Sequence, residues 1–180
     1  MPKLIILRIG HRVKRDARVT THVCLTARAF GADGVIVSDV VDEGLERTIE
    51  KVVRAFGGSF WIRTGEPWRR VVGDWIGAGN ELVHLTMYGL PIQEVIDEIR
   101  SSPRDKLIAV GSQKVPGELY RLATWNVSIT NQPISEVSAL AIFLDRYFEG
   151  RELSAKFEGG ELEIIPSRSG KRIIRKRGAI

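Results

Sequence analysis

Short apolar runs alternate along this chain with segments in which apolar residues recur at helical spacing. The first run, KLIILRI at residues 3–9, is apolar almost throughout, which is typical of a strand buried on both faces of a parallel sheet. Similar strand-like runs follow at residues 34–38, 59–63, 81–87, 106–110 and 125–129. Helical spacing occurs at residues 20–30, 42–56, 68–76, 92–100 and 136–148. We therefore predict an α/β fold whose mostly parallel sheet is covered by helices on both faces.

Residues at the predicted helix ends support these boundaries. Asp42 can accept a hydrogen bond at the start of the second helix, and Gly57 follows directly after its end. Pro91 is suited to open the fourth helix, because an N–H in the first helical turn has no partner within the helix. For the first helix, Thr20 and Thr21 are the candidate caps.

Residues 124–149 place a strand, a polar turn and an amphipathic helix in one short segment. The strand ends in Thr130, Asn131, Gln132 and Pro133, which are residue types that favour turns. One face of the helix that follows carries the apolar residues Val137, Leu140, Ala141, Leu144, Tyr147 and Phe148. Ile142 and Phe143 begin a second apolar face, which needs a second cover, most simply a partner subunit.

Three successive strand ends carry glycine, proline or small polar residues. They are HLTMYG at residues 84–89, VGSQKVP at 110–116 and ITNQPISE at 129–136. Nucleotide-type ligands bind outside the carboxyl ends of parallel strands, so these turns favour a binding pocket over three plain connectors. The loop after the first strand reads GHRVKRDAR, which is not glycine-rich and disfavours a common dinucleotide fold.

The net charge of +5 is unevenly distributed along the 180 residues. Residues 1–28 hold seven Lys or Arg against Asp16 alone, and residues 168–180 hold six with no acid. The two ends are each about +6, and the residues between them sum to about −7. Two basic ends on an acidic body indicate a polyanionic partner, while a tail that only aids solubility is the alternative.

Other functional classes have little support in the composition. Cys24 is the single cysteine, which excludes an intrachain disulfide and a cysteine-based metal cluster. His11, His22 and His84 lack the close spacing of a zinc motif, so no metal site is expected. The apolar runs are too short to span a membrane and the N-terminus lacks the features of a signal peptide, so a cytoplasmic location is expected.

Several long motifs resemble one family. LRIGHRVKRDARVTTHVCLTARAFGADGVIVSD, HLTMYG, VGSQKVP and NQPISEVSALAIFLDR are together similar to the archaeal tRNA ribose methyltransferases that modify the T-loop cytidine, in the SPOUT superfamily. The resemblance runs in register over residues 4–150. It implies 2′-O-methylation of the cytidine at tRNA position 56, S-adenosyl-L-methionine (AdoMet) as methyl donor, and a homodimer. It also implies a SPOUT-type α/β knot, a deep C-terminal trefoil, which the general rarity of knots would not suggest.

The resemblance places the AdoMet site on the strand ends chosen above. The implied cofactor-binding residues are Leu85, Gly111, Ser112, Gln113, Lys114, Val115, Ile129, Thr130, Asn131, Gln132, Pro133, Ile134, Ser135 and Glu136. The chain departs from the family pattern at Ser112 and Gln113, where Ala-Glu is usual, at Thr130, where Gly is usual, and at Ile134, where His is usual. Backbone contacts survive such changes, whereas roles of the missing Glu or His side chains do not.

A ribose 2′-hydroxyl is a poor nucleophile, so alignment and deprotonation both help its methylation. Related ribose methyltransferases carry an arginine in the first motif, but Leu25 stands at that place here. Arg18 is the nearest candidate, as a phosphate holder that lowers the hydroxyl's pKa. His22 lies four residues further on, and its ordinary pKa suits proton transfer, although a structural histidine is the commoner case. Arg18 and His22 are therefore the predicted catalytic residues.

RNA contact is predicted for both basic ends. The candidate residues are Arg8, Arg12, Lys14, Arg15, Lys171, Arg172, Arg175, Lys176 and Arg177. The four tryptophans are interpreted first as core or dimer-interface residues, and Trp68, beside two arginines, is the candidate for stacking on an unpaired base. His84 and Cys24 are interpreted as packed core residues.

Residues 151–180 differ in pattern from the methyltransferase domain predicted for residues 1–150. We expect a β-hairpin that turns around Gly159 and Gly160, followed by a mobile basic tail that holds the tRNA backbone. Two alternatives to the enzyme remain open. One is an inactive RNA-binding module of the same fold, and the other is an α/β scaffold whose basic ends bind a membrane or a protein.

Overall fold

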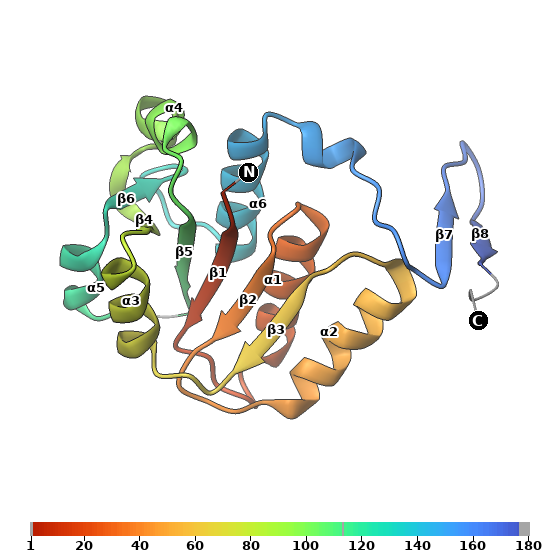
Figure 1. Ribbon diagram of the computed structural model, residues 1–180, viewed down its shortest axis with the longest axis horizontal. Helices are drawn as coiled ribbons and strands as arrows, with labels where there is room; N and C mark the ends of the chain where they lie inside the picture. Colours follow the sequence, from red (N-terminus) through yellow and green to blue (C-terminus); the bar gives the residue numbers. More distant parts are fainter. Residues whose placement is uncertain (1, 113, 177–180) are drawn as a thin grey trace.

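The computed structural model describes residues 2–112 and 114–176. Its main body is a six-stranded sheet in which every neighbouring pair of strands is parallel (Figure 1). The strands are β1 (Leu4–Ile9), β2 (Gly34–Val37), β3 (Trp61–Thr64), β4 (Glu81–Pro91), β5 (Lys106–Gly111) and β6 (Trp125–Ser128). Their spatial order is β3-β2-β1-β5-β4-β6, so the predicted parallel α/β sheet is confirmed.

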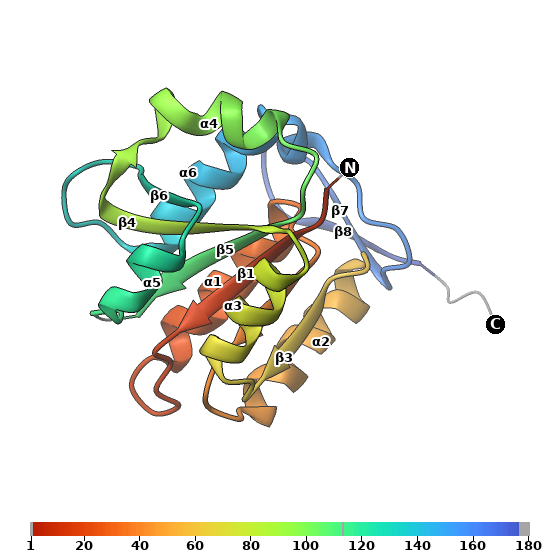
Figure 2. The ribbon, with the colours of Figure 1, turned by 60° about the vertical axis from the view of Figure 1, so that its left-hand side comes forward.

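Helices cover both faces of this sheet, as predicted. They are α1 (Ala17–Ala29), α2 (Glu43–Phe56), α3 (Trp68–Gly77), α4 (Ile92–Ser101), α5 (Gly117–Leu122) and α6 (Glu136–Phe148). The buried residues of α1, α2, α4 and α6 pack into one core layer, and those of α3 and α5 into the other. Figure 2 shows α3 and α5 in front of the sheet, with α1 and α6 behind it.

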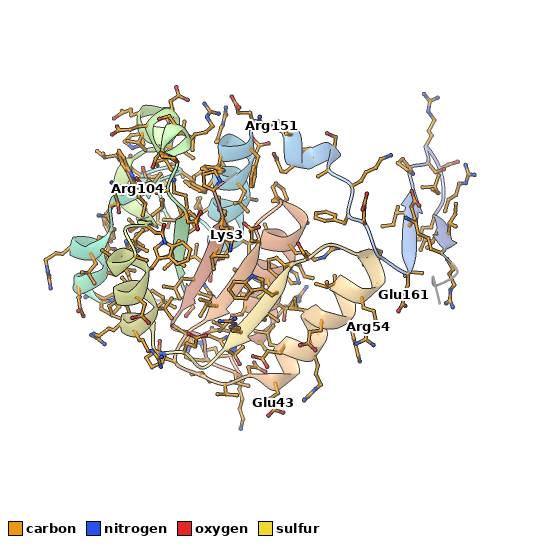
Figure 3. The ribbon with its side chains drawn as sticks, viewed as in Figure 1. Lys3, Glu43, Arg54, Arg104, Arg151 and Glu161 are labelled. Carbon is orange, nitrogen blue, oxygen red and sulfur yellow. The ribbon has the colours of Figure 1, made fainter. Side chains whose placement is uncertain are left out.

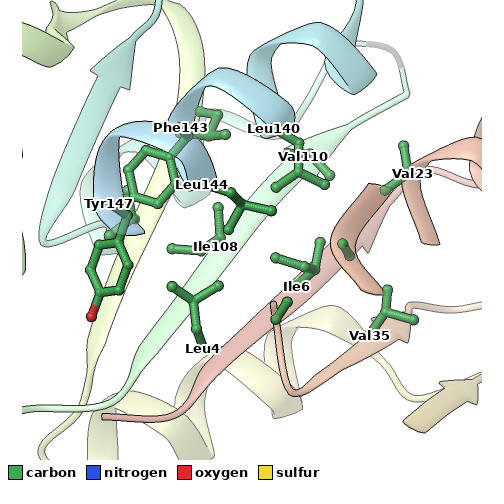
Figure 4. Packing of buried hydrophobic residues seen from close by; sticks show 14 of the residues in the cluster. Leu4, Ile6, Val23, Val35, Ile108, Val110, Leu140, Phe143, Leu144 and Tyr147 are labelled. Carbon is green, nitrogen blue, oxygen red and sulfur yellow. The ribbon is translucent and has the colours of Figure 1, made fainter. Parts of the chain in front are cut away.

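Strand β1 shows why the first apolar run is continuous. Leu4 and Ile6 point to the α1 and α6 layer, whereas Ile5, Leu7 and Ile9 point to the α3 and α5 layer. Both sets of side chains are almost fully buried, and Figure 4 shows Leu4 and Ile6 in the first of the two layers. Each buried aliphatic side chain contributes on the order of 1.5–3 kcal/mol, so a strand inside two layers must be apolar on both sides.

Two of the helix starts agree with the sequence and one does not. Asp42 caps α2, since its carboxylate accepts a hydrogen bond from the Leu45 N–H at 3.0 Å. Pro91 directly precedes the first residue of α4. The prediction that Thr20 or Thr21 caps the first helix is wrong, because α1 already begins at Ala17. Thr20 lies inside the helix and is buried, where its hydroxyl has other partners.

The second apolar face predicted for α6 is smaller than expected. Phe143 is fully buried in the same core layer as Leu140, Leu144 and Tyr147, and it stacks on Tyr147 with ring centroids 6.1 Å apart. Ile142 remains as an apolar side chain of the helix that is 41% exposed. The prediction was therefore wrong for Phe143, and Ile142 alone of that pair is left without cover within the described chain.

A short 3₁₀ turn, η1 (Arg151–Ser154), leads from α6 to an antiparallel hairpin of β7 (Leu162–Ile165) and β8 (Arg172–Arg175). The hairpin itself was predicted, but its turn at Gly159 and Gly160 was wrong. The chain reverses between β7 and β8, and the basic segment expected to be a mobile tail forms β8 within the described residues.

Gly160 is instead placed at a contact between the hairpin segment and the main body. Gly160 lies against the end of α2, where an added Cβ would be 2.6 Å from the Phe56 carbonyl carbon. At the same junction the Glu161 N–H donates to the Arg54 carbonyl at 3.2 Å, and Figure 3 shows both residues there. Beyond this contact the hairpin stands beside the main body (Figure 1). The trefoil knot implied by the resemblance stays a prediction.

Candidate functional site

The carboxyl ends of β4, β5 and β6 and the start of α6 surround a cavity of about 240 Å³. Apolar side chains and backbone of the three predicted turns form most of its wall. The lining residues are Leu85, Thr86, Met87, Val110, Gly111, Val127, Ile129, Thr130, Gln132, Pro133, Ile134, Glu136 and Ala139. Glu136 is the one acidic residue among these lining residues. A concave, mainly apolar site with few polar groups is the usual form of a small-molecule site.

An irregularity in β4 builds one wall of this cavity. Both Leu85 and Leu90 pair with Val127 of β6, so the residues between them leave the regular ladder. Gly89 lies so close to β6 that an added Cβ would be 2.5 Å from the Asn126 carbonyl. The side-chain amide of Asn131 then ties this excursion to the turn after β6, donating to the carbonyls of Met87 at 2.8 Å and Gly89 at 3.2 Å.

A second hollow of about 630 Å³ shares Leu85, Thr86, Met87 and Gly111 with the first, and Lys114 and Val115 are among its other lining residues. At its base His84 is buried, with its Nδ1 2.9 Å from the Asn126 Oδ1, as the predicted packed histidine. Burial lowers the pKa of His84, and the hydrogen bond to Asn126 opposes this only in part. His84 is therefore neutral near pH 7.

The predicted cofactor residues come together at these two hollows. Those that line the cavity or the second hollow are Leu85, Gly111, Lys114, Val115, Ile129, Thr130, Gln132, Pro133, Ile134 and Glu136. Three others support the wall: Asn131 ties the β4 excursion, Ser135 caps α6 by accepting from the Val137 N–H at 3.2 Å, and Ser112 donates to the Gly10 carbonyl. Gln113 lies outside the described residues. Cofactor binding by these residues stays a prediction.

Arg8 is not on the surface. It is 0% exposed, and its guanidinium Nη2 donates to the Glu136 Oε1 at 2.8 Å. Its Nε is 3.4 Å from the Thr20 hydroxyl, and its Nη1 is buried without a partner in the described chain. The prediction that Arg8 contacts RNA is therefore wrong. Its sequence position already indicated the true orientation, because Arg8 shares the parity of Leu4 and Ile6, which face α1.

A buried polar chain extends from this arginine. The Thr20 hydroxyl lies 2.8 Å from the His11 Nδ1, and the His11 Nε2 lies 3.1 Å from the Asp42 Oδ2. Burial alone would raise the pKa of Asp42, but hydrogen bonds from the Leu45 N–H and from His11 outweigh it and hold that pKa below its ordinary value. The sequence did not predict this series of hydrogen bonds, because the residues that form it lie on separate elements.

The predicted catalytic residues lie on the exposed side of α1. Arg18 and His22 are four residues apart on the helix, on the same side as expected, and both are exposed. Neither lines the cavity or the second hollow. Lys14 and Arg15 are exposed in the preceding loop, where the Arg12 guanidinium pairs with Asp16 at 2.8 and 3.0 Å. These hydrogen bonds lower the pKa of Asp16.

The basic hairpin and the tryptophan candidate have different outcomes. Lys171, Arg172, Arg175 and Lys176 are exposed, as RNA contact requires, whereas Arg177 lies outside the described residues. Trp68 is buried, with the Arg69 guanidinium 4.5 Å from its ring centroid, so it is the core residue that was the first interpretation and not a platform for a base. Within residues 2–112 and 114–176, no cluster of three or more side chains could hold a metal ion. No described helix is long and apolar enough to cross a membrane.

Known proteins resemble this chain in sequence. The family described as tRNA ribose 2′-O-methyltransferase, aTrm56, matches residues 56–174. A relative from Methanopyrus kandleri named tRNA (cytidine(56)-2′-O)-methyltransferase is 51% identical over 174 residues, 97% of either chain. A relative of that name from Thermoplasma volcanium is 55% identical over 94% of this chain, which spans 49% of the relative.

Solved structures share the fold at low sequence identity. An RNA 2′-O ribose methyltransferase superposes with a TM-score of 0.61 at 21% identity, over 84% of this chain and 58% of its own. The SpoU methyltransferase AviRb from Streptomyces viridochromogenes, in complex with AdoMet, gives 0.57 at 15% identity, over 86% and 59%. This chain thus spans less than two thirds of either structure. The family match covers most of the chain and confirms the resemblance drawn from its motifs: the chain belongs to the aTrm56 family of tRNA ribose 2′-O-methyltransferases.

Proposed function

We propose that this chain is an AdoMet-dependent methyltransferase that modifies the 2′-hydroxyl of the cytidine at tRNA position 56. The observation that carries the proposal is the cavity at the ends of β4, β5 and β6, built from the same three turns that match the family. The name of the relatives supports the choice of nucleotide, and the AviRb structure in complex with AdoMet supports the choice of cofactor.

The cavity's chemistry fits AdoMet. Leu85, Val110 and Ile129 offer apolar surface to an adenine ring, and the turn after β6 brings backbone polar groups next to it. AdoMet is cationic at its sulfonium, and no basic side chain among the cavity's lining residues would repel that charge. When bound, it supplies an activated methyl group, and the protein has to hold the ribose oxygen in line with that group.

The basic residues around α1 are proposed to hold the substrate. Arg12, Lys14, Arg15 and Arg18 lie on the loop after β1 and the first turn of α1, where a phosphate beside the reacting ribose would meet concentrated positive charge. Lys171, Arg172, Arg175 and Lys176 would hold a more distant part of the tRNA backbone. In this arrangement Arg18 positions the phosphate next to the target ribose.

Methyl transfer to unmodified tRNA tests the proposal. The protein is incubated with radiolabelled AdoMet and a tRNA transcript, and a matched transcript carries 2′-deoxycytidine at position 56. Label in the first transcript and none in the second is the expected result. Equal labelling of the two would place the modification elsewhere.

An inactive RNA-binding module is the second candidate, and the departures from the family pattern at Gln113, Thr130 and Ile134 are what favour it. Calorimetric titration with AdoMet separates the two proposals. Saturable heat with one site per chain is expected for the enzyme, whereas tRNA binding without any AdoMet heat would favour the inactive module.

A homodimer and a cytoplasmic location complete the proposal. Ile142 on α6 and Leu90 at the end of β4 are 41% and 54% exposed, and a second subunit would remove both from water. Light scattering should give twice the mass of 20.1 kDa, and Ile142→Glu should shift the protein toward the monomer. The cytoplasm is where such an enzyme would meet its tRNA.

A further inference from the structure

We propose that Glu136 accepts the proton of the ribose 2′-hydroxyl during methyl transfer, and that the buried Arg8 positions its carboxylate. This inference rests on the proposed methyltransferase function. It differs from a mechanism based on Arg18 or His22, because those exposed residues do not line the cavity, whereas Glu136 does.

The burial of Arg8 is the first observation. A guanidinium without exposed surface is costly unless it is paired, and charged residues are rarely placed inside a sheet for stability alone. Arg8 lies next to last in β1, and within the described residues its one ion pair is with Glu136, which is 128 residues away along the chain. The pair therefore joins the centre of the sheet to the first residue of α6 at the cavity wall.

The polar chain behind Arg8 fixes the direction of this ion pair. The Asp42 carboxylate only accepts, so the His11 Nε2, 3.1 Å from the Asp42 Oδ2, donates to it. The Thr20 hydroxyl is hydrogen-bonded to the His11 Nδ1 at 2.8 Å and accepts from the Arg8 Nε at 3.4 Å. With the Nε edge held in this way, Nη2 points to Glu136.

One of the two carboxylate oxygens of Glu136 is available to a ligand in the cavity. Arg8 contacts its Oε1 at 2.8 Å, and one quarter of the side chain is exposed in the cavity. Its Oε2 forms no hydrogen bond within the described residues, so it can accept one from a ligand. The loop that carries Arg12 and Arg15 follows β1 directly, which places the substrate's proposed phosphate contacts on the side of Arg8.

The way in which charge moves during methyl transfer favours a role of Glu136 at the ribose hydroxyl over a role at the sulfonium. An oxygen lone pair forms the new C–O bond, the C–S bond breaks with its electron pair going to sulfur, and the hydroxyl proton passes to Oε2 of Glu136. The ribose oxygen becomes more positive as it attacks, while the sulfonium loses its charge. A carboxylate beside the oxygen stabilises the transition state, whereas one beside the sulfur stabilises mainly the bound cofactor.

Glu136→Gln is the decisive variant. It keeps an oxygen for Arg8 and the same size, but it cannot take a proton. We expect kcat for tRNA methylation to fall by about 10²–10⁴-fold, the usual contribution of a general base. The calorimetric Kd for AdoMet should change by less than about threefold, and the acid limb of the wild-type pH profile of kcat should disappear. Glu94→Gln, an exposed carboxylate on α4, is the matched control and should match the wild type.

Arg8→Lys tests the positioning role. Lysine keeps the charge but cannot bridge Thr20 and Glu136 with a planar fork, so kcat should fall while the KM for tRNA stays near the wild-type value. Thermal unfolding of each variant shows that it is folded, and AdoMet binding is measured alongside. Glu136→Asp, which shortens the side chain but keeps the carboxylate, should recover part of the activity lost in Glu136→Gln.

The outcomes separate this inference from the proposed function. A wild-type protein that binds AdoMet but methylates no tRNA overturns the proposed function and this assignment with it. An active wild type with Glu136→Gln within threefold of its kcat overturns the assignment alone. Lost AdoMet affinity with unchanged kcat at saturation also overturns it, since Glu136 would then be a cofactor ligand.

Discussion

Cys24 lies on α1 with no exposed surface, as its sequence interpretation required. Burial raises the pKa of its thiol to about 12, so the reactive thiolate is nearly absent at pH 8. We expect no reaction of the native protein with a thiol reagent such as dithionitrobenzoate, and one thiol per chain after denaturation in guanidinium. Rapid reaction of the native protein, at a rate independent of denaturant, would contradict this burial.

Asp42 has two functions that substitution can separate. It caps α2 through the Leu45 N–H and accepts from His11. Asp42→Ala removes both and should cost about 0.5–2 kcal/mol of stability from the cap alone, whereas Asp42→Asn keeps a capping oxygen and should cost less. Urea unfolding at pH 7 measures both, and equal losses in the two variants would show that the cap contributes nothing.

The same carboxylate predicts a dependence of stability on pH. Because the pKa of Asp42 is lowered in the folded state, its contribution is complete above the ordinary value of 3.8 and is lost as the pH falls through the folded value. The advantage of the wild type over Asp42→Asn should therefore be constant between pH 5 and pH 7 and shrink below about pH 4. Thermal unfolding of both proteins at a series of pH values measures this difference in stability. An advantage of the wild type that grows below about pH 4 would contradict the prediction.

At the scale of elements, Asn131 connects two strand ends. Its amide donates to Met87 and Gly89 and so holds the β4 excursion against the turn after β6. Asn131→Asp has nearly the same shape but no N–H donor, and each lost hydrogen bond is worth about 0.5–1.5 kcal/mol. If AdoMet needs this wall in place, loss of the two hydrogen bonds should raise its calorimetric Kd roughly 5–150-fold. Ser138→Ala on the exposed side of α6 is the control, and unchanged affinity in Asn131→Asp would show that the wall is held without Asn131.

The success of the sequence predictions follows from how local each signal is. Apolar runs and turn residues depend on near neighbours, so the six strands and the three turns at the cavity were predicted correctly. The predicted position of the hairpin turn was wrong because Gly160 is needed where the chain packs against the end of α2. That contact is between distant residues, so no local sequence pattern contains it. The orientation of Arg8 could have been predicted from its parity with Leu4 and Ile6, but its partner Glu136 could not, because the two residues are 128 positions apart.

At the scale of the whole molecule, positive charge is concentrated away from the cavity as well as beside it. Lys171, Arg172, Arg175 and Lys176 are exposed on and next to β8, in a hairpin that joins the main body at the end of α2. Lys176 is partly neutralised by Glu163, whose Oε2 lies 3.1 Å from its Nζ. The hairpin can therefore contribute an electrostatic contact with RNA that is separate from the residues around α1.

Replacing Lys171, Arg172, Arg175 and Lys176 with glutamine tests this contact. We expect weaker tRNA binding and a less steep fall of log K with log salt, by roughly 0.7–0.9 for each side chain that neutralises a phosphate. The KM for tRNA should rise with little change in kcat or in AdoMet affinity, because phosphate contacts of this kind position the substrate without entering the chemistry. The matched control replaces Arg47, Lys51, Arg70 and Arg121, which are exposed on α2, α3 and α5, and changes the net charge equally. Equal effects in the two variants would mean that tRNA responds to total charge alone and that the hairpin holds no specific part of its backbone.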